Sequence, residues 1–324
     1  MFKKASALAL TISSALAFSA QATSLSVSEP LLNTTFPSAS GVVIDGTTLY
    51  AVGDDSPWLY NMDLDFNILS QDLIKHYPVG DNGRILKKVK PDFEAMESFT
   101  VNGRPALVLL GSGSKQDIRE WAYVISKDKG VKIERSLVAL YEQLYRASKF
   151  SGKQELNIEG LAISEDTVYI FNRGNGGSNI IFSLTAAEFE DYLLGKQDKI
   201  DSLRTYHVSL PNVQGFEAGL SGGTYWEETD SLVFTASVEA TGDAYNDGEI
   251  LGSFVGHFEV GQLSETKTLD LSPYAQSIDK NGKPVITKVE SVSIKVSTPE
   301  SIEGALASDN DDGTSEFFSF SLHK

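Results

Sequence analysis

Short apolar runs separated by Gly, Asn and Asp recur along most of the chain, and within each run apolar and polar residues largely alternate. Alternation with a period of two is typical of β-strands that bury one face. Five such runs end in polar clusters: TLYAVGDD, ALVLLGSG, TVYIFNRG, SLVFTASV and GALASDND. The pattern predicts an all-β protein.

Each of these five runs has apolar neighbours on both sides. A second run follows it after a variable loop: WLYNMD, EWAYVIS, NIIFSL, GSFVGHFEV and SEFFSFSL. A third run precedes it: SASGVVID, DFEAMESF, NIEGLAIS, GFEAGLSG and KVESVSIK. A fourth strand is expected in most units, as in ILSQDLI, GVKIERSL, LRTYHVSL and TKTLDLS. A repeated unit of three or four consecutive short strands is typical of a single β-propeller domain, here over residues 23–324.

One position in each preceding run marks the repeat: Ser40, Glu94, Glu159, Glu217 and Glu290. The markers lie 54, 65, 58 and 73 residues apart, as expected when insertions fall in loops. We therefore expect five blades, and the 73-residue gap leaves room for a sixth. The last unit stops at Lys324 after its third strand, so the N-terminal segment SLSVSEPLL is expected to close the ring. Closure removes exposed sheet edges.

Two segments break the strand pattern and predict short helical insertions. Residues 136–149 have apolar positions at helical spacing behind a serine cap. Residues 185–195 open with Thr185 and Glu188, a capping box, and end on Gly195. We assign no chemistry to either helix.

The N-terminus predicts the compartment. Lys3 and Lys4 precede a short apolar run and an Ala-x-Ala site, the layout of a signal peptide cleaved after Ala22. We therefore expect a periplasmic or secreted protein. No other stretch reaches the ~18 apolar residues of a spanning helix, so membrane insertion is not expected. The chain has no cysteine, which excludes disulfides and thiolate metal sites.

The charge of the chain bears on its partners. The formal net charge of -17 includes Lys3 and Lys4, so the chain after cleavage is more acidic still. Such acidity argues against nucleic acid as a partner, because phosphate backbones repel it. The sequence holds no signal for an oligomeric state.

The predicted topology brings many acids to one end of the channel, because inner strands start where the next strands end. The expected metal ligands are Glu94, Glu159, Glu217, Glu290, Asp54, Asp55, Asp309 and Asp311. Carboxylates this close need a counter-charge, and oxygen ligands alone suit Ca²⁺ better than Mg²⁺. The alternative is that the acids accept hydrogen bonds from strand amides and line a solvated channel.

Other chemistry has weaker signals. The loop GSGSKQD, with Lys115, would contact an anion through backbone amides, or it is a plain turn. No GxSxG motif is present, and the histidines His76, His207, His257 and His323 stand in strand-like or turn segments. Paired carboxylates for glycoside hydrolysis are abundant, but their separation is not set by sequence.

The segments SASGVVI…YAVGDDSPWLY, KPDFEA…LLGSGSK, LNIEGLAI…RGN and KVES…SDNDDG resemble an uncharacterised family of exported bacterial propellers, grouped near the phytase-like or esterase-like propellers. The phytase-like group implies an acidic channel with bound calcium that hydrolyses phosphate esters. Glu159 and Gly160 match its Glu-Gly on an inner strand. This chain departs from a phosphate pocket in having few bases near the acids: Arg173, Lys115, Lys88 and Lys90.

Three functions stay open. The first is a calcium-dependent hydrolase of phosphate or carboxylic esters, with Glu159, Arg173 and Lys115 as catalytic candidates and an ester or phosphoester at the channel mouth. The second is a non-catalytic propeller that binds a small molecule, glycan or protein, with structural calcium. The third is a glycosidase.

Overall fold

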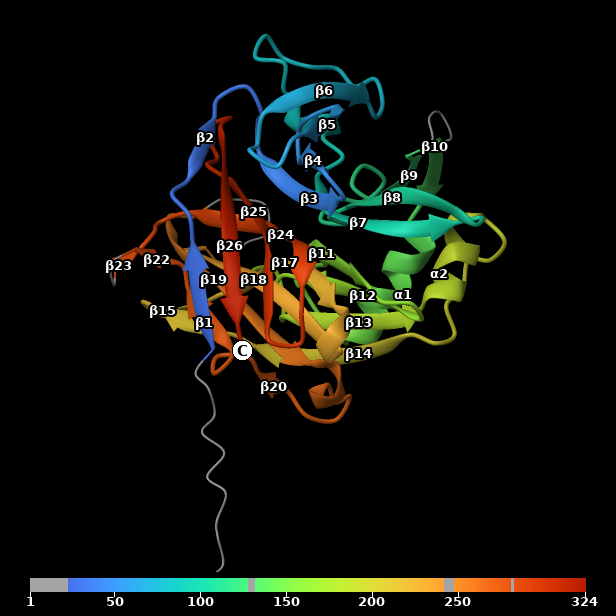
Figure 1. Ribbon diagram of the computed structural model, residues 1–324. Helices are drawn as coiled ribbons and strands as arrows, with labels where there is room; N and C mark the ends of the chain where they lie inside the picture. The colour runs from blue at the N-terminus through green and yellow to red at the C-terminus, as the bar shows by residue number, and fades with distance from the viewer. Residues whose placement is uncertain (1–22, 128–131, 242–247, 281–282) are drawn as a thin grey trace, which may run out of the picture.

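The computed structural model describes residues 23–127, 132–241, 248–280 and 283–324. Five sheets of four or five strands stand around one axis (Figure 1). Their innermost strands contact one another in the order β3, β7, β11, β17 and β24, and β24 contacts β3 again. The predicted all-β, five-bladed propeller is confirmed.

The first two blades follow the predicted strand pattern. Blade 1 consists of β3 (Ala39–Asp45), β4 (Thr48–Gly53), β5 (Trp58–Met62) and β6 (Ile68–Leu73). Blade 2 consists of β7 (Phe93–Val101), β8 (Arg104–Gly111), β9 (Trp121–Ser126) and β10 (Lys132–Ser136). Successive strands in each blade are antiparallel. A loop between the blades carries the 3-10 turn η1 (Lys87–Val89).

Blades 3 and 4 differ from the prediction in their outer strands. Blade 3 consists of β11 (Ile158–Ile163), β12 (Thr167–Asn172), β13 (Ile180–Thr185), β14 (Arg204–Ser209) and β20 (Leu269–Asp270). Blade 4 consists of β17 (Gly219–Trp226), β18 (Ser231–Glu239), β19 (Ile250–Glu259) and β21 (Ala275–Ser277).

The segment TKTLDLS was predicted as the outer strand of blade 4, and this is wrong. Its residues Leu269–Asp270 pair in parallel with β14 of blade 3, and Ala275–Ser277 takes the outer place in blade 4. The long gap before Glu290 therefore supplies strands to two existing blades, and no sixth blade forms from the described residues in it.

Blade 5 joins the two ends of the described chain. It consists of β24 (Lys288–Ser297), β25 (Ser301–Asp309), β26 (Ser315–His323) and the N-terminal strands β1 (Ser24–Val27) and β2 (Leu31–Asn33). Both N-terminal strands are antiparallel to β26, as the blue and red arrows of Figure 1 show. The predicted closure by the N-terminal segment is confirmed. Where β26 pairs with β1 and β2, it has a hydrogen-bonded neighbour on both sides.

The hydrophobic core is divided among the five gaps between neighbouring blades. Each gap holds one cluster of buried side chains drawn from the two blades that face it. Between blades 5 and 1, for example, Phe36 and Phe317 stack with ring centroids 5.6 Å apart. Blade-to-blade packing therefore holds the ring together and keeps its axis free for polar side chains.

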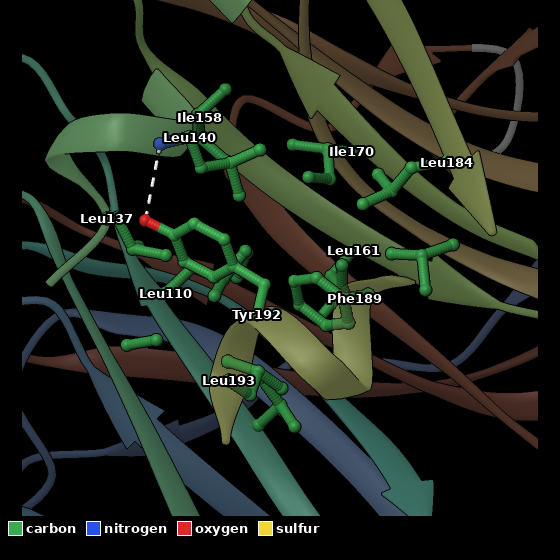
Figure 2. Packing of buried hydrophobic residues seen from close by; sticks show 14 of the residues in the cluster. Leu110, Leu137, Leu140, Ile158, Leu161, Ile170, Leu184, Phe189, Tyr192 and Leu193 are labelled. Carbon is green, nitrogen blue, oxygen red and sulfur yellow. Dashed lines mark hydrogen bonds between the residues drawn. The ribbon is translucent and has the colours of Figure 1, made fainter. Parts of the chain in front are cut away.

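The two helices enlarge the cluster between blades 2 and 3. They are α1 (Val138–Ser148) and α2 (Ala186–Leu193). Figure 2 shows Phe189, Tyr192 and Leu193 of α2 among leucines and isoleucines of both blades. The Tyr192 hydroxyl accepts a hydrogen bond from Leu140 N at 3.2 Å and donates one to Ser136 O at 2.8 Å. Both helices are thus part of the core.

The predicted cap of α2 is confirmed, whereas the predicted cap of α1 is wrong. Thr185 caps α2 by accepting a hydrogen bond from Glu188 N, and Gly195 after the helix has a φ of 70°. The serine cap predicted for α1 is wrong, because the residue before the helix is Leu137. Ser136 lies in β10, where its oxygen is 3.4 Å from Val138 N.

The remaining short elements lie in loops. They are the strands β15 (Asn212–Val213), β16 (Phe216–Glu217), β22 (Asp279–Lys280) and β23 (Lys283–Pro284), and the 3-10 turns η2 (Glu227–Thr229) and η3 (Val260–Gln262). No helix among the described residues is long and apolar enough to cross a membrane. The predicted signal peptide, residues 1–22, lies outside the described residues, so export stays a prediction.

Candidate functional site

Every inner strand has a β-bulge near its start. In each case one residue is skipped in the pairing with the next strand, and these residues are Ser40, Glu94, Glu159, Ser221 and Glu290. A bulge leaves one residue without a partner and re-aims its side chain. The bulge therefore defines an equivalent position in all five blades, at one mouth of the channel.

The prediction that Glu217 holds this position in blade 4 is wrong. Glu217 lies two residues before β17, in the exposed hairpin of β15 and β16, where it accepts a hydrogen bond from Leu210 N at 2.9 Å. The hairpin turns at Gln214 and Gly215, both with positive φ. The bulge residue is Ser221. The sequence carried a signal for it, because Ser221-Gly222 repeats Ser40-Gly41.

Serine and glutamate at the bulge have different tasks. The Ser221 hydroxyl donates to Val289 O of blade 5 at 2.6 Å, and the Ser40 hydroxyl donates to Phe93 O of blade 2. These two serines tie one blade to the next. Glu94, Glu159 and Glu290 instead line the central cavity.

Small residues after the bulge let the inner strands approach one another. A Cβ placed on Gly160 would lie 3.0 Å from the carbonyl carbon of Gly222 in the neighbouring strand. A Cβ on Gly222 would lie 2.8 Å from Glu290 O. Close backbone approach is the expected reason for glycine inside a strand. The packing explanation of the Glu-Gly pair therefore holds at Gly160.

A cavity of about 360 Å³ opens at this mouth, and most of the residues that line it are charged. Nine acidic and six basic side chains line it, a formal excess of three negative charges. The acids are Asp54, Asp55, Asp92, Glu94, Glu159, Glu239, Glu290, Asp309 and Asp311. The bases are Arg84, Lys87, Lys90, Arg119, Arg173 and Lys288.

Most of the residues predicted for the site meet here. They are Asp54, Asp55, Glu94, Glu159, Arg173, Glu290, Asp309 and Asp311. Lys115 and Glu217 do not line the cavity. The ammonium of Lys115 lies 3.3 Å from Lys88 O on the loop before blade 2. The convergence of strand starts and strand ends, inferred from propeller topology, therefore brings eight of the ten residues proposed as ligands or catalysts to the cavity.

One half of the cavity is organised by Arg173 and Lys288. The Arg173 guanidinium, only 3% exposed, lies 3.4 Å from Glu159, 3.2 Å from Glu239 and 3.8 Å from Glu290. The Lys288 ammonium lies 3.3 Å from Glu239 and 3.2 Å from Glu290. Burial opposes ionisation of Glu239, but the two cations outweigh it and hold the pKa of Glu239 below its usual value.

The other half is organised by cations from the segment that leads into blade 2 and from the loop after β8. The Lys90 ammonium pairs with Asp54 and lies 2.7 Å from Asp92 Oδ1. Arg119 donates to the second oxygen of Asp92. Burial raises the pKa of Asp92, but Lys90 and Arg119 together lower it below its ordinary range. Asp92 is therefore held ionised.

Asp55 and Asp309 lie at the edge of this network and behave differently. Asp55 pairs with Arg84, yet burial and the adjacent Asp54 raise its pKa to about 6. Burial and then Asp54 raise the pKa of Asp309 to about 8, against the opposing effect of Lys288. Asp309 is therefore protonated over part of the neutral range.

Glu94 stands apart from the other acids. Its side chain is 8% exposed and lines the cavity, and within the described residues it has no hydrogen bond or ion pair. Burial, followed by repulsion from Glu159 and Asp92, raises the pKa of Glu94 well above its usual value. Burial likewise raises the pKa of Glu290, even with Lys288 close by. Among the described residues, no cation thus lies within ion-pair distance of Glu94.

Among the described residues, two groups of carboxylates have the spacing of a cation site, and Glu94 belongs to both. Oxygen atoms of Glu94, Glu159 and Glu290 lie within 4.8 Å of one another. Oxygen atoms of Asp54, Asp92 and Glu94 do so as well. Buried acids in these groups are able to hold a metal ion, and all their ligand atoms are oxygens.

The sequence interpretation missed four cations of the cavity: Arg84, Lys87, Arg119 and Lys288. Lys288 stands two residues before Glu290 on β24, so it had the same signal as Asp92 and Asn157, which precede their bulge residues by two. Arg84 and Arg119 come from loops, and no periodicity marks them. The shortage of bases expected from the sequence is therefore not found.

Residues 35–322 match a family of unknown function, DUF6929. The chain belongs to this family. The match spans all five blades, which agrees with the resemblance to an uncharacterised family noted in the sequence. Among curated proteins, no relative matches the chain.

Solved structures similar to this DUF6929 member share little sequence with it. The α-L-arabinofuranosidase of Podospora anserina is 8% identical, with a TM-score of 0.45 over 88% of this chain and 91% of its own. The arabinanase Arb43A of Bacillus subtilis is 12% identical, with a TM-score of 0.43 over 91% and 95%. A DUF4221 member from Bacteroides vulgatus is 10% identical, with a TM-score of 0.39 over 93% and 99%. None of these three is a phytase, and the phytase likeness stays a prediction.

Proposed function

We propose that this DUF6929 protein is a calcium-dependent hydrolase of small, polar phosphate or carboxylic esters, and that it acts at the central cavity. One observation carries the proposal: Glu94 is a buried carboxyl without a cation, and it faces the cavity between two other glutamates. A buried carboxylate without a partner is costly, so it is normally paired, protonated or bound to a metal.

The donor set supports calcium over other ions. The three glutamates offer carboxylate oxygens alone, and a hard cation with six to eight oxygen ligands suits them. Asp92 and Asp54 are within reach of Glu94 on the other side. Export through residues 1–22, which we also propose, would expose the protein to extracytoplasmic calcium, where oxygen-ligand sites of modest affinity suffice.

The cavity supports a small charged substrate. At about 360 Å³ it accepts a compact molecule, and Ile85 and Leu86 are the two aliphatic side chains in its lining. Arg173 and Lys288 lie beside the glutamates and supply positive charge for an anionic ester group. In the reaction, water adds to the phosphorus or carbonyl carbon, the bond to the alkoxy oxygen breaks, and that oxygen takes up a proton. A bound divalent cation would supply the Lewis acid for this step.

The test compares calcium binding by the wild type and two single variants. Calcium is expected to raise the melting temperature of the wild type by roughly 5–10 °C at saturating concentration, and a chelator is expected to reverse the rise. Glu94→Gln should remove this response. Glu217→Gln is the matched control, because Glu217 is exposed and outside the ring. A wild type that melts at the same temperature with calcium and with chelator would rule out the calcium site.

Turnover is measured separately on nitrophenyl phosphates and short-chain nitrophenyl carboxylates. We expect hydrolysis that needs calcium and is lost in Glu94→Gln, with activity retained in Glu217→Gln. A calcium response without turnover of any substrate would favour the second candidate, a propeller that binds a ligand without reacting with it.

One observation favours that second candidate. Arg84, Lys90, Arg119, Arg173 and Lys288 are each paired with at least one carboxylate. Because these cations are already paired, a polar ligand would bind by replacing some of the ion pairs with its own, and no reaction step is needed.

A further inference from the structure

The two carboxylate groups that share Glu94 differ in what already neutralises them. The first group is Asp54, Asp92 and Glu94, and the second is Glu94, Glu159 and Glu290. Two adjacent groups with a shared carboxylate are the arrangement that holds two metal ions in many hydrolytic sites. The number of metal ions that this cavity binds therefore depends on whether a cationic side chain already occupies either group.

The first group already contains a cation. The Lys90 ammonium pairs with Asp54 Oδ2 and lies 2.7 Å from Asp92 Oδ1, so it bridges two of the three acids. Lys90 follows η1 directly and its backbone is extended, which carries the side chain from the loop into the cavity. The surrounding carboxylates raise the pKa of Lys90 despite its burial, so the ammonium stays charged.

The second group also has cations beside it, but they lie farther from its carboxylate oxygens than Lys90 lies from those of the first group. Arg173 contacts Glu159 and Glu290, and Lys288 contacts Glu290, but neither pairs with Glu94. Glu94 is more than nine-tenths buried, lines the cavity and has no partner among the described residues. Glu94, which has no ion pair among the described residues, thus belongs both to a group that Lys90 bridges closely and to a group whose ion pairs are longer.

We propose that Lys90 is the built-in cation of the first group, and that its ammonium restricts the cavity to a single divalent ion, bound by Glu94, Glu159 and Glu290. The identity of that single ion rests on the proposed function, whereas the occupancy of the first group by Lys90 does not. On this basis Lys90 is a positioning residue. It fixes the side chains of Asp54 and Asp92, and it leaves the Glu94 carboxylate available to bind the ion of the second group.

The proposal predicts that replacing Lys90 increases the number of calcium ions that the protein binds. Lys90→Met keeps the length of the side chain and removes its charge, which leaves three carboxylates without their bridging cation. We expect calcium stoichiometry, measured by titration calorimetry and by direct metal analysis after dialysis, to rise from one ion in the wild type to two in Lys90→Met. Lys88→Met is the control, because Lys88 is an exposed lysine of the same turn that does not line the cavity, and it should keep one ion.

The outcomes separate this proposal from the proposed function. A wild type with no ion and a Lys90→Met variant with one ion would remove the calcium site of the proposed function and leave the role of Lys90 intact. A wild type with two ions would overturn the role of Lys90. A folded Lys90→Met variant with no more ions than the wild type would overturn it as well.

Lys90→Met is also informative if it does not fold without calcium. The proposal then expects millimolar calcium to restore the wild-type circular dichroism spectrum, and failure of that rescue counts against it. The double variant Lys90→Met/Asp54→Asn removes one negative charge together with the ammonium. It should fold without calcium and bind one ion, and a second ion in this variant would contradict the proposed first group.

Discussion

The side chain of Arg173 in blade 3 lies against the backbone of Gly219 in blade 4, so closely that a Cβ on residue 219 would be 2.5 Å from Arg173 Cγ. Gly219 stands two residues before the bulge residue Ser221, the place that Asp92 and Lys288 occupy in their own blades. Blade 4 therefore presents no side chain here, and the guanidinium of the neighbouring blade fills the space. This is how Arg173 reaches Glu239 and Glu290.

Gly219→Ala should displace Arg173, because the added methyl group meets its buried aliphatic stem. We expect the free energy of unfolding to fall by about 1–3 kcal/mol, the usual range for overpacking, when measured by urea denaturation. Gly261→Ala is the control, since a Cβ there would meet no atom within 4 Å. Equal stability of the two variants would show that Arg173 moves aside without loss.

A second carboxyl lies deeper in the channel, three residues after Glu94 on the same strand. Glu97 Oε2 accepts a hydrogen bond from Thr224 at 3.1 Å, and Glu97 Oε1 accepts one from Ser98 N at 2.7 Å. Its strand β7 and the strand β17 of Thr224 are separated by β11 in the ring, so the bond to Thr224 spans the channel. Burial raises the pKa of Glu97 from 4.5 to about 7.

The free energy of unfolding should therefore fall as the pH rises and the Glu97 carboxyl ionises. The raised pKa means that the folded state holds its proton more tightly than the unfolded chain does. That contribution is fully present below pH 4.5 and is lost as the pH rises through about 7. Glu97→Gln keeps the acceptor for Thr224 and cannot ionise, so its stability relative to the wild type should rise between pH 5 and pH 8, by at most about 3 kcal/mol.

The measurement is a series of urea denaturation curves at fixed ionic strength, with chelator present. Glu165→Gln, an exposed acid on the loop after β11, is the control and should follow the wild type at each pH. A Glu97→Gln variant whose difference from the wild type does not change with pH would show that Glu97 does not titrate in this range.

Tyr192 gives a test of the core between blades 2 and 3. Tyr192→Phe keeps the ring and removes the hydroxyl that joins Leu140 N and Ser136 O (Figure 2). Leaving these buried backbone groups without a partner should cost about 1–3 kcal/mol in the free energy of unfolding. Tyr145→Phe, at a more exposed tyrosine of α1, should change it by less than about 0.5 kcal/mol. Similar losses in both variants would contradict a structural role for the Tyr192 hydroxyl.

Much of this molecule was determined by the sequence alone. Short runs of β-branched and aromatic residues such as TLYAVG and TVYIFN, bounded by Gly, Asn and Asp, are a local signal, so they identify β4 and β12 directly. Repetition of the unit predicted five blades, and the unpaired last unit predicted closure by the N-terminal strand. The acids at strand starts and strand ends were brought together correctly, because propeller topology fixes where those ends lie.

Other features were decided only by the tertiary structure. Phe216-Glu217 reads like Phe93-Glu94, but β17 starts at Gly219 and its bulge falls at Ser221, because pairing with β18 sets the register and short sequence patterns do not. Leu269–Asp270 alternates like an outer strand of its own blade and pairs with the neighbouring one.

The charge balance of the cavity was likewise hidden from the sequence. Arg84 and Arg119 arrive from loops, and each reaches an aspartate 27 or more residues away in the chain. Ion pairs of this kind depend on how loops close over the ring, and no periodicity encodes them. The sequence determined the ring and the positions of most of its acids. The tertiary structure decided which acids have a cation beside them, and it left Glu94 with neither a hydrogen bond nor an ion pair among the described residues.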